Sequence, residues 1–271
     1  MTKLTYSRYL KLNQLLTSQQ LLSPQEHPFA HDELLFIITH QSFELWFRQI
    51  VHEFDCLQHA FRQNQLGTIL DTLKRILIIF NLCNHQFQVL ETMSPTAFAT
   101  FRNQFGNASG FQSIQFREIE FMMGLKRSSL VGEIAPDEFG RPQLLKRYDS
   151  PTVWDAFLYY LHNRGYPVPE QQLERDVTQP IEPCIEIQAT LFGVYHQDLI
   201  MRHICEQFLD LDTLVQTWRQ RHLLLAERML GNSPGTYGMS LSYLRGTIQP
   251  HFPDLWKVRQ QFIQTEPATA V

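Results

Sequence analysis

A histidine follows a tryptophan by four residues in the run Trp218-Arg219-Gln220-Arg221-His222, inside a stretch whose pattern predicts a helix. Residues four apart share a helix face, so the indole would lie one turn before the imidazole. A neutral imidazole binds iron through one ring nitrogen while a partner orients the other. His222 is therefore a candidate axial ligand of a haem. The competing interpretation is a surface histidine, or a core histidine satisfied by its neighbours.

A second histidine, His40, lies in an apolar run between Phe36 and Trp46. Phe36, His40 and Glu44 or Phe47 share one face of the expected helix, at four- and three-residue spacing. A phenyl ring one turn from an imidazole could wall a pocket for an aromatic ligand, with which the imidazole would form one hydrogen bond. Taken alone, the segment favours a core helix whose histidine is satisfied locally.

Arg117 ends the run Ser109-Gly110-Phe111-Gln112-Ser113-Ile114-Gln115-Phe116-Arg117. An arginine on so apolar a helix needs an anionic partner if it is buried. The planar guanidinium group suits a carboxylate, which it can bind through two hydrogen bonds. That carboxylate could belong to a ligand, or to an acid of the chain such as Glu118 or Glu120, which is the commoner outcome.

The segment Gly235-Thr236-Tyr237-Gly238 follows the expected end of a helix at Gly231. Loops of small residues with a hydroxyl group can close over a substrate and contact its polar head group through backbone amides and the threonine. Ordinary helix connections have the same composition. Thr236 is therefore a candidate only in combination with the other residues.

Several metal and catalytic motifs are missing from the sequence. No glutamate has a histidine three positions later, as a di-iron helical bundle requires twice. The zinc pattern His-Glu-x-x-His is not completed, because Cys56 stands where His52-Glu53 would need its second histidine. Nucleophile elbows and phosphate-binding glycine loops are also absent. For a helical protein, this leaves haem or no cofactor.

Composition indicates a folded domain with extensive buried surface, since 44% of the 271 residues are hydrophobic and only 18% are charged. The net charge is −4 and no block of lysine or arginine stands out, so neither nucleic acid nor an anionic membrane is expected as a partner. The N-terminus lacks the layout of a signal peptide, and the apolar windows are too short to span a bilayer. A cytoplasmic protein is expected. The four cysteines lie far apart, which argues against a zinc site; they are Cys56, Cys83, Cys184 and Cys205.

Hydrophobic spacing of three and four residues predicts helices along nearly the whole chain. We expect an all-α protein, with residues 1–271 forming one domain and 265–271 a flexible tail. The segment 136–147 is polar and is predicted to be irregular, and 165–183, with its prolines, to be a connector. The expected helices cover 31–63, 70–90, 95–105, 111–125, 150–162, 186–230 with an interruption around 209–212, 240–248 and 253–262.

Placed in order, these segments resemble the tryptophan 2,3-dioxygenase family over nearly the whole chain. Several independent motifs agree in order and spacing. They are Tyr6-Ser7-Arg8-Tyr9, His31-Asp32-Glu33, His40-Gln41 with Glu44-Leu45-Trp46, Leu90-Glu91-Thr92-Met93, the block 109–117, the block 218–222, and Phe252-Pro253-Asp254-Leu255.

The resemblance implies a helical bundle that binds haem b, with His222 as the axial ligand of the iron. Trp218 would lie near the free nitrogen of that imidazole. His40 matches the catalytic histidine that contacts the indole N–H group, and Phe36 matches the ring that packs beside the substrate.

The resemblance further implies that Arg117 holds the substrate carboxylate and that Thr236 meets the amino-acid head group. Tyr6 and Tyr9, within the N-terminal segment 1–20, match tyrosines that complete the pocket of a neighbouring subunit. The family is an all-helical homotetramer, so a homotetramer is expected.

The expected reaction is cleavage of the indole C2–C3 bond of L-tryptophan by O₂, giving N-formylkynurenine in the kynurenine pathway of tryptophan catabolism. One departure from the family is Tyr237, which replaces a glycine in the loop after Thr236. An alternative is a related haem oxygenase that adds one oxygen atom to a tryptophan derivative or another aromatic amino acid. A non-catalytic haem-binding or tryptophan-binding protein, or a scaffold without a cofactor, would be a different class.

Overall fold

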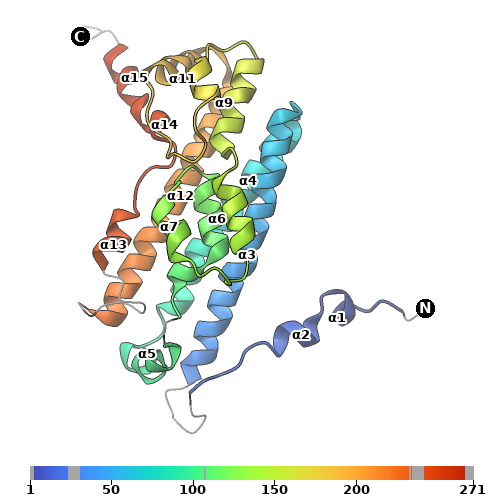
Figure 1. The fold of residues 1–271 in the computed structure, drawn as a ribbon, viewed down its shortest axis with the longest axis vertical. Coiled ribbons are helices and arrows are strands. Elements are labelled where there is room, and N and C mark those ends of the chain that lie inside the picture. The colour runs from blue at the N-terminus through green and yellow to red at the C-terminus, as the bar shows by residue number, and fades with distance from the viewer. Residues whose placement is uncertain (1–2, 24–30, 107, 232, 234–240, 266–271) are drawn as a thin grey trace, which may run out of the picture.

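The computed structural model describes residues 3–23, 31–106, 108–231, 233 and 241–265 (Figure 1). Its regular elements are helices, and no β-strand occurs within these ranges, so the all-α prediction is confirmed. The elements are α1 (Tyr6–Tyr9), α2 (Leu12–Leu16), α3 (His31–Arg62), α4 (Leu66–Leu90), α5 (Pro95–Arg102), η1 (Asn103–Phe105), η2 (Gly110–Gln112), α6 (Ile114–Met122), α7 (Ser128–Glu133), α8 (Arg141–Tyr148), α9 (Val153–Asn163), α10 (Glu170–Leu173), α11 (Ile185–Gln197), α12 (Leu199–Leu230), α13 (Leu241–Gly246), α14 (Pro253–Lys257) and α15 (Arg259–Thr265).

Three long helices, α3, α4 and α12, form the frame, and α4 packs against both of the others (Figure 1). The buried face of α3 is carried by Phe43, Phe47, Ile50, Phe54 and Leu57, which alternate spacings of four and three residues. This spacing makes one apolar stripe along a helix. The shorter helices α6 and α9 pack on α3 and complete the core.

The interruption expected around 209–212 is wrong, because α12 runs without a break from Leu199 to Leu230. The boundary lies earlier, at Asp198, whose Oδ1 atom accepts the backbone N–H groups of Ile200 and Met201 at 2.9 and 3.0 Å. An aspartate that accepts these N–H groups begins a helix.

Two further expectations need correction. The segment predicted to be irregular contains α8, where Pro142 lies in the first turn and needs no intrahelical hydrogen bond. The expected helix over 111–125 is divided at Ser113, whose hydroxyl accepts the N–H of Phe116 at 3.2 Å and begins α6. Helix α6 ends before Gly124, whose φ of 102° lies in a region that glycine adopts readily.

Different helices lie at the two ends of the bundle. Helix α5 lies at the end where α3 begins and α12 finishes, whereas α11, α14 and α15 gather at the opposite end (Figure 1). The N-terminal helices α1 and α2 form an arm that extends away from the bundle (Figure 1). None of the helices within the described ranges is long and apolar enough to cross a membrane.

Candidate active site

The site is built on the C-terminal half of α12 (Leu199–Leu230). Val215, Trp218 and His222 follow one another at spacings of three and four. The rings of Trp218 and His222 have centroids 5.4 Å apart. The predicted arrangement, with the indole one turn before the imidazole on one face, is therefore present.

The indole of Trp218 is enclosed by phenyl rings from three other helices. Its ring centroid lies between 4.6 and 5.9 Å from those of Phe43 and Phe47 on α3, Phe87 on α4, and Phe116 on α6. The indole nitrogen Nε1 is buried and has no hydrogen-bond partner among the residues described. A buried N–H group without a partner is uncommon. It marks a place where a further group could accept a hydrogen bond.

The pKa of His222 is lowered to about 4, mainly by burial and to a smaller extent by the nearby His40, Arg219 and Arg117. The imidazole is therefore neutral at pH 7. No residue in the described ranges is hydrogen-bonded to this ring. A neutral imidazole with a free lone pair is the form that coordinates iron.

His40 lies in the first turns of α3, and its Nδ1 atom is 2.8 Å from the carbonyl oxygen of Phe36. A carbonyl oxygen only accepts, so Nδ1 carries the proton and Nε2 presents a lone pair. Burial lowers the pKa of His40, although this carbonyl and the charge of Glu44 act in the opposite direction. The imidazole is therefore a neutral acceptor.

Ring contacts connect the two histidines. The centroids of His40 and Phe43 are 6.2 Å apart, those of Phe43 and Trp218 are 5.9 Å apart, and Trp218 contacts His222. Phe36 packs on His40 at 4.0 Å. It also joins an aromatic cluster at this end of the bundle, formed by Phe98, Phe101 and Phe105.

Arg117 is a buried residue of α6. Its Nη1 atom lies 2.6 Å from the Oε2 atom of Glu120, so the chain supplies one of the acids considered as its partner. Its guanidinium group also lies 5.5 and 5.4 Å from the ring centroids of Phe111 and Phe116. The charges of Arg117 and His40 both lower the pKa of His222. The structure thus brings Arg117 to the same end of the bundle as the two histidines.

Not every predicted residue is brought to this site. Thr236 lies outside the described residues, as do the rest of its loop from residue 234 to 240 and the expected tail from residue 266. Thr265, which was expected to begin that tail, is the last residue of α15. Tyr6 and Tyr9 lie on the N-terminal arm, with 75% and 72% of their surface exposed. They therefore do not line the pocket of their own chain.

Two residues of the site were not foreseen as functional. Arg219 is buried on α12, and its guanidinium lies 5.0 Å from the ring centroid of Phe116. Glu120 is fully buried and forms ion pairs with Arg219 as well as Arg117. Arg219 precedes His222 by three residues, and Glu120 follows Arg117 by three, so each lies near a candidate residue on its own helix. This spacing is the signal in the sequence that could have indicated them.

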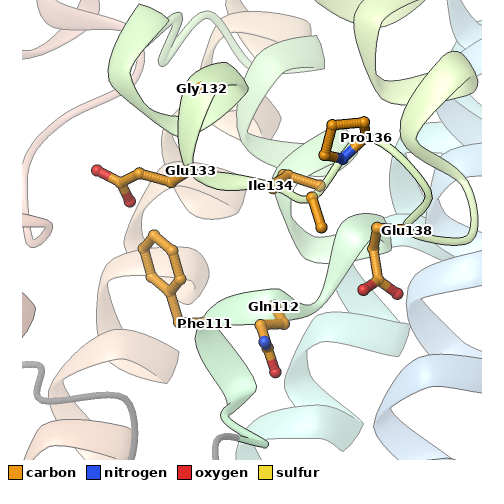
Figure 2. A pocket seen from close by; sticks show the side chains of 8 residues that line it. Phe111, Gln112, Gly132, Glu133, Ile134, Pro136 and Glu138 are labelled. Carbon is orange, nitrogen blue, oxygen red and sulfur yellow. The ribbon is translucent and has the colours of Figure 1, made fainter.

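A separate cleft of about 140 Å³ lies between η2 and the segment 132–138. None of its lining residues is a predicted site residue. Figure 2 shows the carboxylates of Glu133 and Glu138 on its two sides, an arrangement that disfavours a ligand bearing a carboxylate. The lining residues are Phe111, Gln112, Gly132, Glu133, Ile134, Ala135, Pro136 and Glu138.

The fold and the site together define an all-helical protein with two neutral imidazoles and a buried arginine at one end of an aromatic bundle. The family model described as tryptophan 2,3-dioxygenase matches residues 1–135 and 196–262. The chain belongs to the tryptophan 2,3-dioxygenase family.

Relatives from several bacteria agree with this assignment, and each is named tryptophan 2,3-dioxygenase. The protein of Herpetosiphon aurantiacus is 45% identical over 257 residues, which cover 94% of this chain and 97% of the relative. That of Anaeromyxobacter dehalogenans is 42% identical over 258 residues, covering 94% and 95%. That of an Arthrobacter species is 35% identical over 268 residues, covering 97% and 93%.

Proposed function

We propose that this protein cleaves the indole C2–C3 bond of L-tryptophan with O₂ and forms N-formylkynurenine, as expected for tryptophan catabolism through the kynurenine pathway. Both oxygen atoms would enter the product, so no external reductant is consumed. The observation that carries the proposal is the meeting of neutral His40, neutral His222 and buried Arg117 at one end of the bundle. Membership of a haem-dependent, O₂-using family supports it.

The residues present fit a haem. No group of three or more histidine, cysteine, aspartate or glutamate side chains able to hold a metal ion occurs in the described part of the chain. Iron bound at His222 would therefore bring further ligands of its own, as a porphyrin does. The buried, unpartnered N–H of Trp218 gives this side of the site a donor for a group outside the described chain.

We infer that haem b is held by His222, with Trp218 packed beside the ligand. When bound, the haem supplies the activation of O₂, which amino-acid side chains do not provide. The protein contributes ligand orientation, a dry aromatic surrounding and the placement of the substrate. The phenyl rings around Trp218 limit the access of water to the indole nitrogen, which is buried.

For the substrate, Arg117 would bind the carboxylate and Thr236 the amino-acid head group. The Nε2 lone pair of His40 is free to accept the indole N–H, because Nδ1 is committed to the Phe36 carbonyl. Phe36 would pack against the indole ring. Fixing both ends of the substrate aligns C2 and C3 for reaction, which is a large part of what an active site contributes.

We further propose a homotetramer in which Tyr6 and Tyr9 enter the pocket of a neighbouring subunit. Their exposure on an arm that extends from the bundle supports this role (Figure 1). Exposed aromatic side chains on such an arm favour burial against another chain. Residence in the cytoplasm remains a prediction from the sequence.

The decisive experiment is reaction of the reduced, haem-loaded protein with L-tryptophan and isotopically labelled O₂, followed by mass spectrometry. We expect N-formylkynurenine carrying two labelled oxygen atoms. A product with one labelled atom would instead indicate a monooxygenase acting on this or a related aromatic amino acid. An unreacted complex would indicate a binding protein.

A further inference from the structure

A single buried carboxylate gathers three arginines beside the candidate site. Glu120 has no solvent-exposed surface, and it forms ion pairs with Arg117 on its own helix, Arg127 before α7, and Arg219 on α12. The side chains of Arg117 and Arg219 are 6% and 5% exposed. Burial makes such charge pairs sensitive to the loss of either partner.

The two oxygen atoms of Glu120 have different partners. Oε1 faces both Arg127, at 3.0 Å, and Arg219, whereas Oε2 faces Arg117 at 2.6 Å. Arg117 is thus held by one oxygen, and the helix that carries His222 is held by the other. The carboxylate connects the proposed carboxylate-binding residue on α6 to the proposed haem-ligand helix α12.

An arginine side chain has several rotatable bonds, and holding its guanidinium group in one place costs conformational entropy. A binding arginine that is already held by a buried anion loses less of this freedom when a ligand arrives. Phe111 and Phe116 flank the same guanidinium group and limit its remaining movement. Glu120 would therefore fix where Arg117 presents its N–H groups.

We propose that Glu120 is a positioning residue that holds Arg117 for the substrate carboxylate and so gives the site its preference for an indole amino acid over an indole without a carboxylate. This inference rests on the proposed function. Glu120 itself would not contact the substrate.

The variant Glu120→Gln tests the proposal because an amide keeps the shape of the side chain but has only one oxygen. Two guanidinium groups face the Oε1 position and one faces the Oε2 position. The amide oxygen should therefore turn toward Arg127 and Arg219, which leaves an NH₂ group against Arg117. A donor facing a donor releases Arg117 selectively.

The matched control is Glu118→Gln. Glu118 is also buried in α6, but its Oε2 atom accepts from Arg147 at 3.1 Å. This substitution removes a buried acid from the same helix without changing the contact between Glu120 and Arg117.

The experiment measures the dissociation constants of L-tryptophan and tryptamine for the haem-loaded proteins, together with KM and kcat for tryptophan. Glu120→Gln should weaken tryptophan binding and raise its KM by about tenfold or more, while tryptamine binding and kcat stay within about twofold. Glu118→Gln should leave both dissociation constants within about twofold of the wild type.

If Glu120→Gln does not fold, Glu120→Asp replaces it, because the shorter acid keeps the charge but cannot reach both sides. It should show the same selective loss for tryptophan, to a smaller extent. Unchanged tryptophan binding, or equal losses for tryptophan and tryptamine, would overturn the positioning role while leaving the proposed function intact. A wild-type protein that binds no tryptophan would overturn the proposed function and this inference together.

Discussion

The indole of Trp218 stacks on the ring of Phe116, with centroids 4.6 Å apart and planes inclined by 28°. This contact joins α12 to α6, one turn before His222 on one helix and one residue before Arg117 on the other. Because both helices are packed through buried rings, the distance between the proposed haem ligand and the proposed carboxylate clamp is set by the core.

Trp218→Phe should separate the packing of the indole from its N–H group. In the haem-free protein the free energy of unfolding should change little, by about 1 kcal/mol, because removing an unsatisfied buried donor offsets the lost ring volume. In the haem-loaded protein, the Soret band should shift and hemin affinity should fall. Urea denaturation and hemin titration measure the two effects.

The control for this variant is Trp154→Phe, since Trp154 is buried in the core and packs against Phe157 and Phe252. It should destabilise the protein and leave the Soret band unchanged. Identical hemin affinity and spectra in wild type and Trp218→Phe would show that the indole N–H plays no part in the site.

The stability of the haem-free protein should fall as the pH drops below neutrality. The pKa of His222 is lowered to about 4 and that of His40 is also lowered, mainly by burial. An unfolded imidazole has a pKa of about 6.5, so the unfolded chain binds more protons between about pH 4 and 6.5. Stability contributed by these groups is complete above that range and is lost within it.

Urea midpoints at about pH 7.5 and about pH 5 test this expectation. The double variant His40→Gln, His222→Gln should lose less stability on acidification than the wild type. An equal loss in both proteins would assign the pH dependence to other groups.

Arg117→Ala should weaken L-tryptophan binding by about 2–5 kcal/mol if the clamp is fully desolvated. Indole, which lacks the carboxylate, should bind with nearly unchanged affinity. Glu120 keeps Arg127 and Arg219 as partners in this variant, so the protein should still fold. Isothermal titration with both ligands measures the difference, and equal losses for the two would exclude a carboxylate contact.

Asp212→Ala should destabilise the opposite half of the bundle. The Asp212 carboxylate accepts backbone N–H groups from His251 and Phe252 and, at 2.8 Å, the indole N–H of Trp256. Losing a buried, hydrogen-bonded charge costs about 3–5 kcal/mol. Asp210→Ala, at an exposed position of the same helix, should cost less than about 0.5 kcal/mol. Urea denaturation compares them, and similar midpoints would contradict a structural role for Asp212.

The long helices were predictable because their apolar spacing is continuous. Helix α3 ends at Arg62, one residue before the expected boundary. The interruption expected in α12 was wrong because the hydrogen-bond partners of Asp212 lie far along the chain. His251 and Phe252 follow it by 39 and 40 positions. Local pattern does not reveal whether an aspartate ends a helix or accepts hydrogen bonds from a distant segment.

The candidate site was predictable in part. His40, His222 and Arg117 were indicated by residue type, spacing and family resemblance, and the structure brings them to one end of the bundle. The role of Glu120 was not predictable beyond its pairing with Arg117, because its other partners, Arg127 and Arg219, lie seven and 99 positions away. Such a cluster exists only once α6 and α12 are packed together.

As the proposed iron ligand, His222 would determine where a haem can lie. His251 is tied to Asp212, ten residues before His222, which corresponds to about 15 Å along the helix. Histidines at that distance cannot substitute for His222 at the iron.

Hemin titration of His222→Ala beside His203→Ala, an exposed histidine on the same helix, tests the ligand assignment most directly. Wild type and His203→Ala should each take up one haem per chain and develop a Soret band, whereas His222→Ala should not. Full haem uptake by His222→Ala, with the same Soret band as the wild type, would contradict the assignment of His222 as the iron ligand.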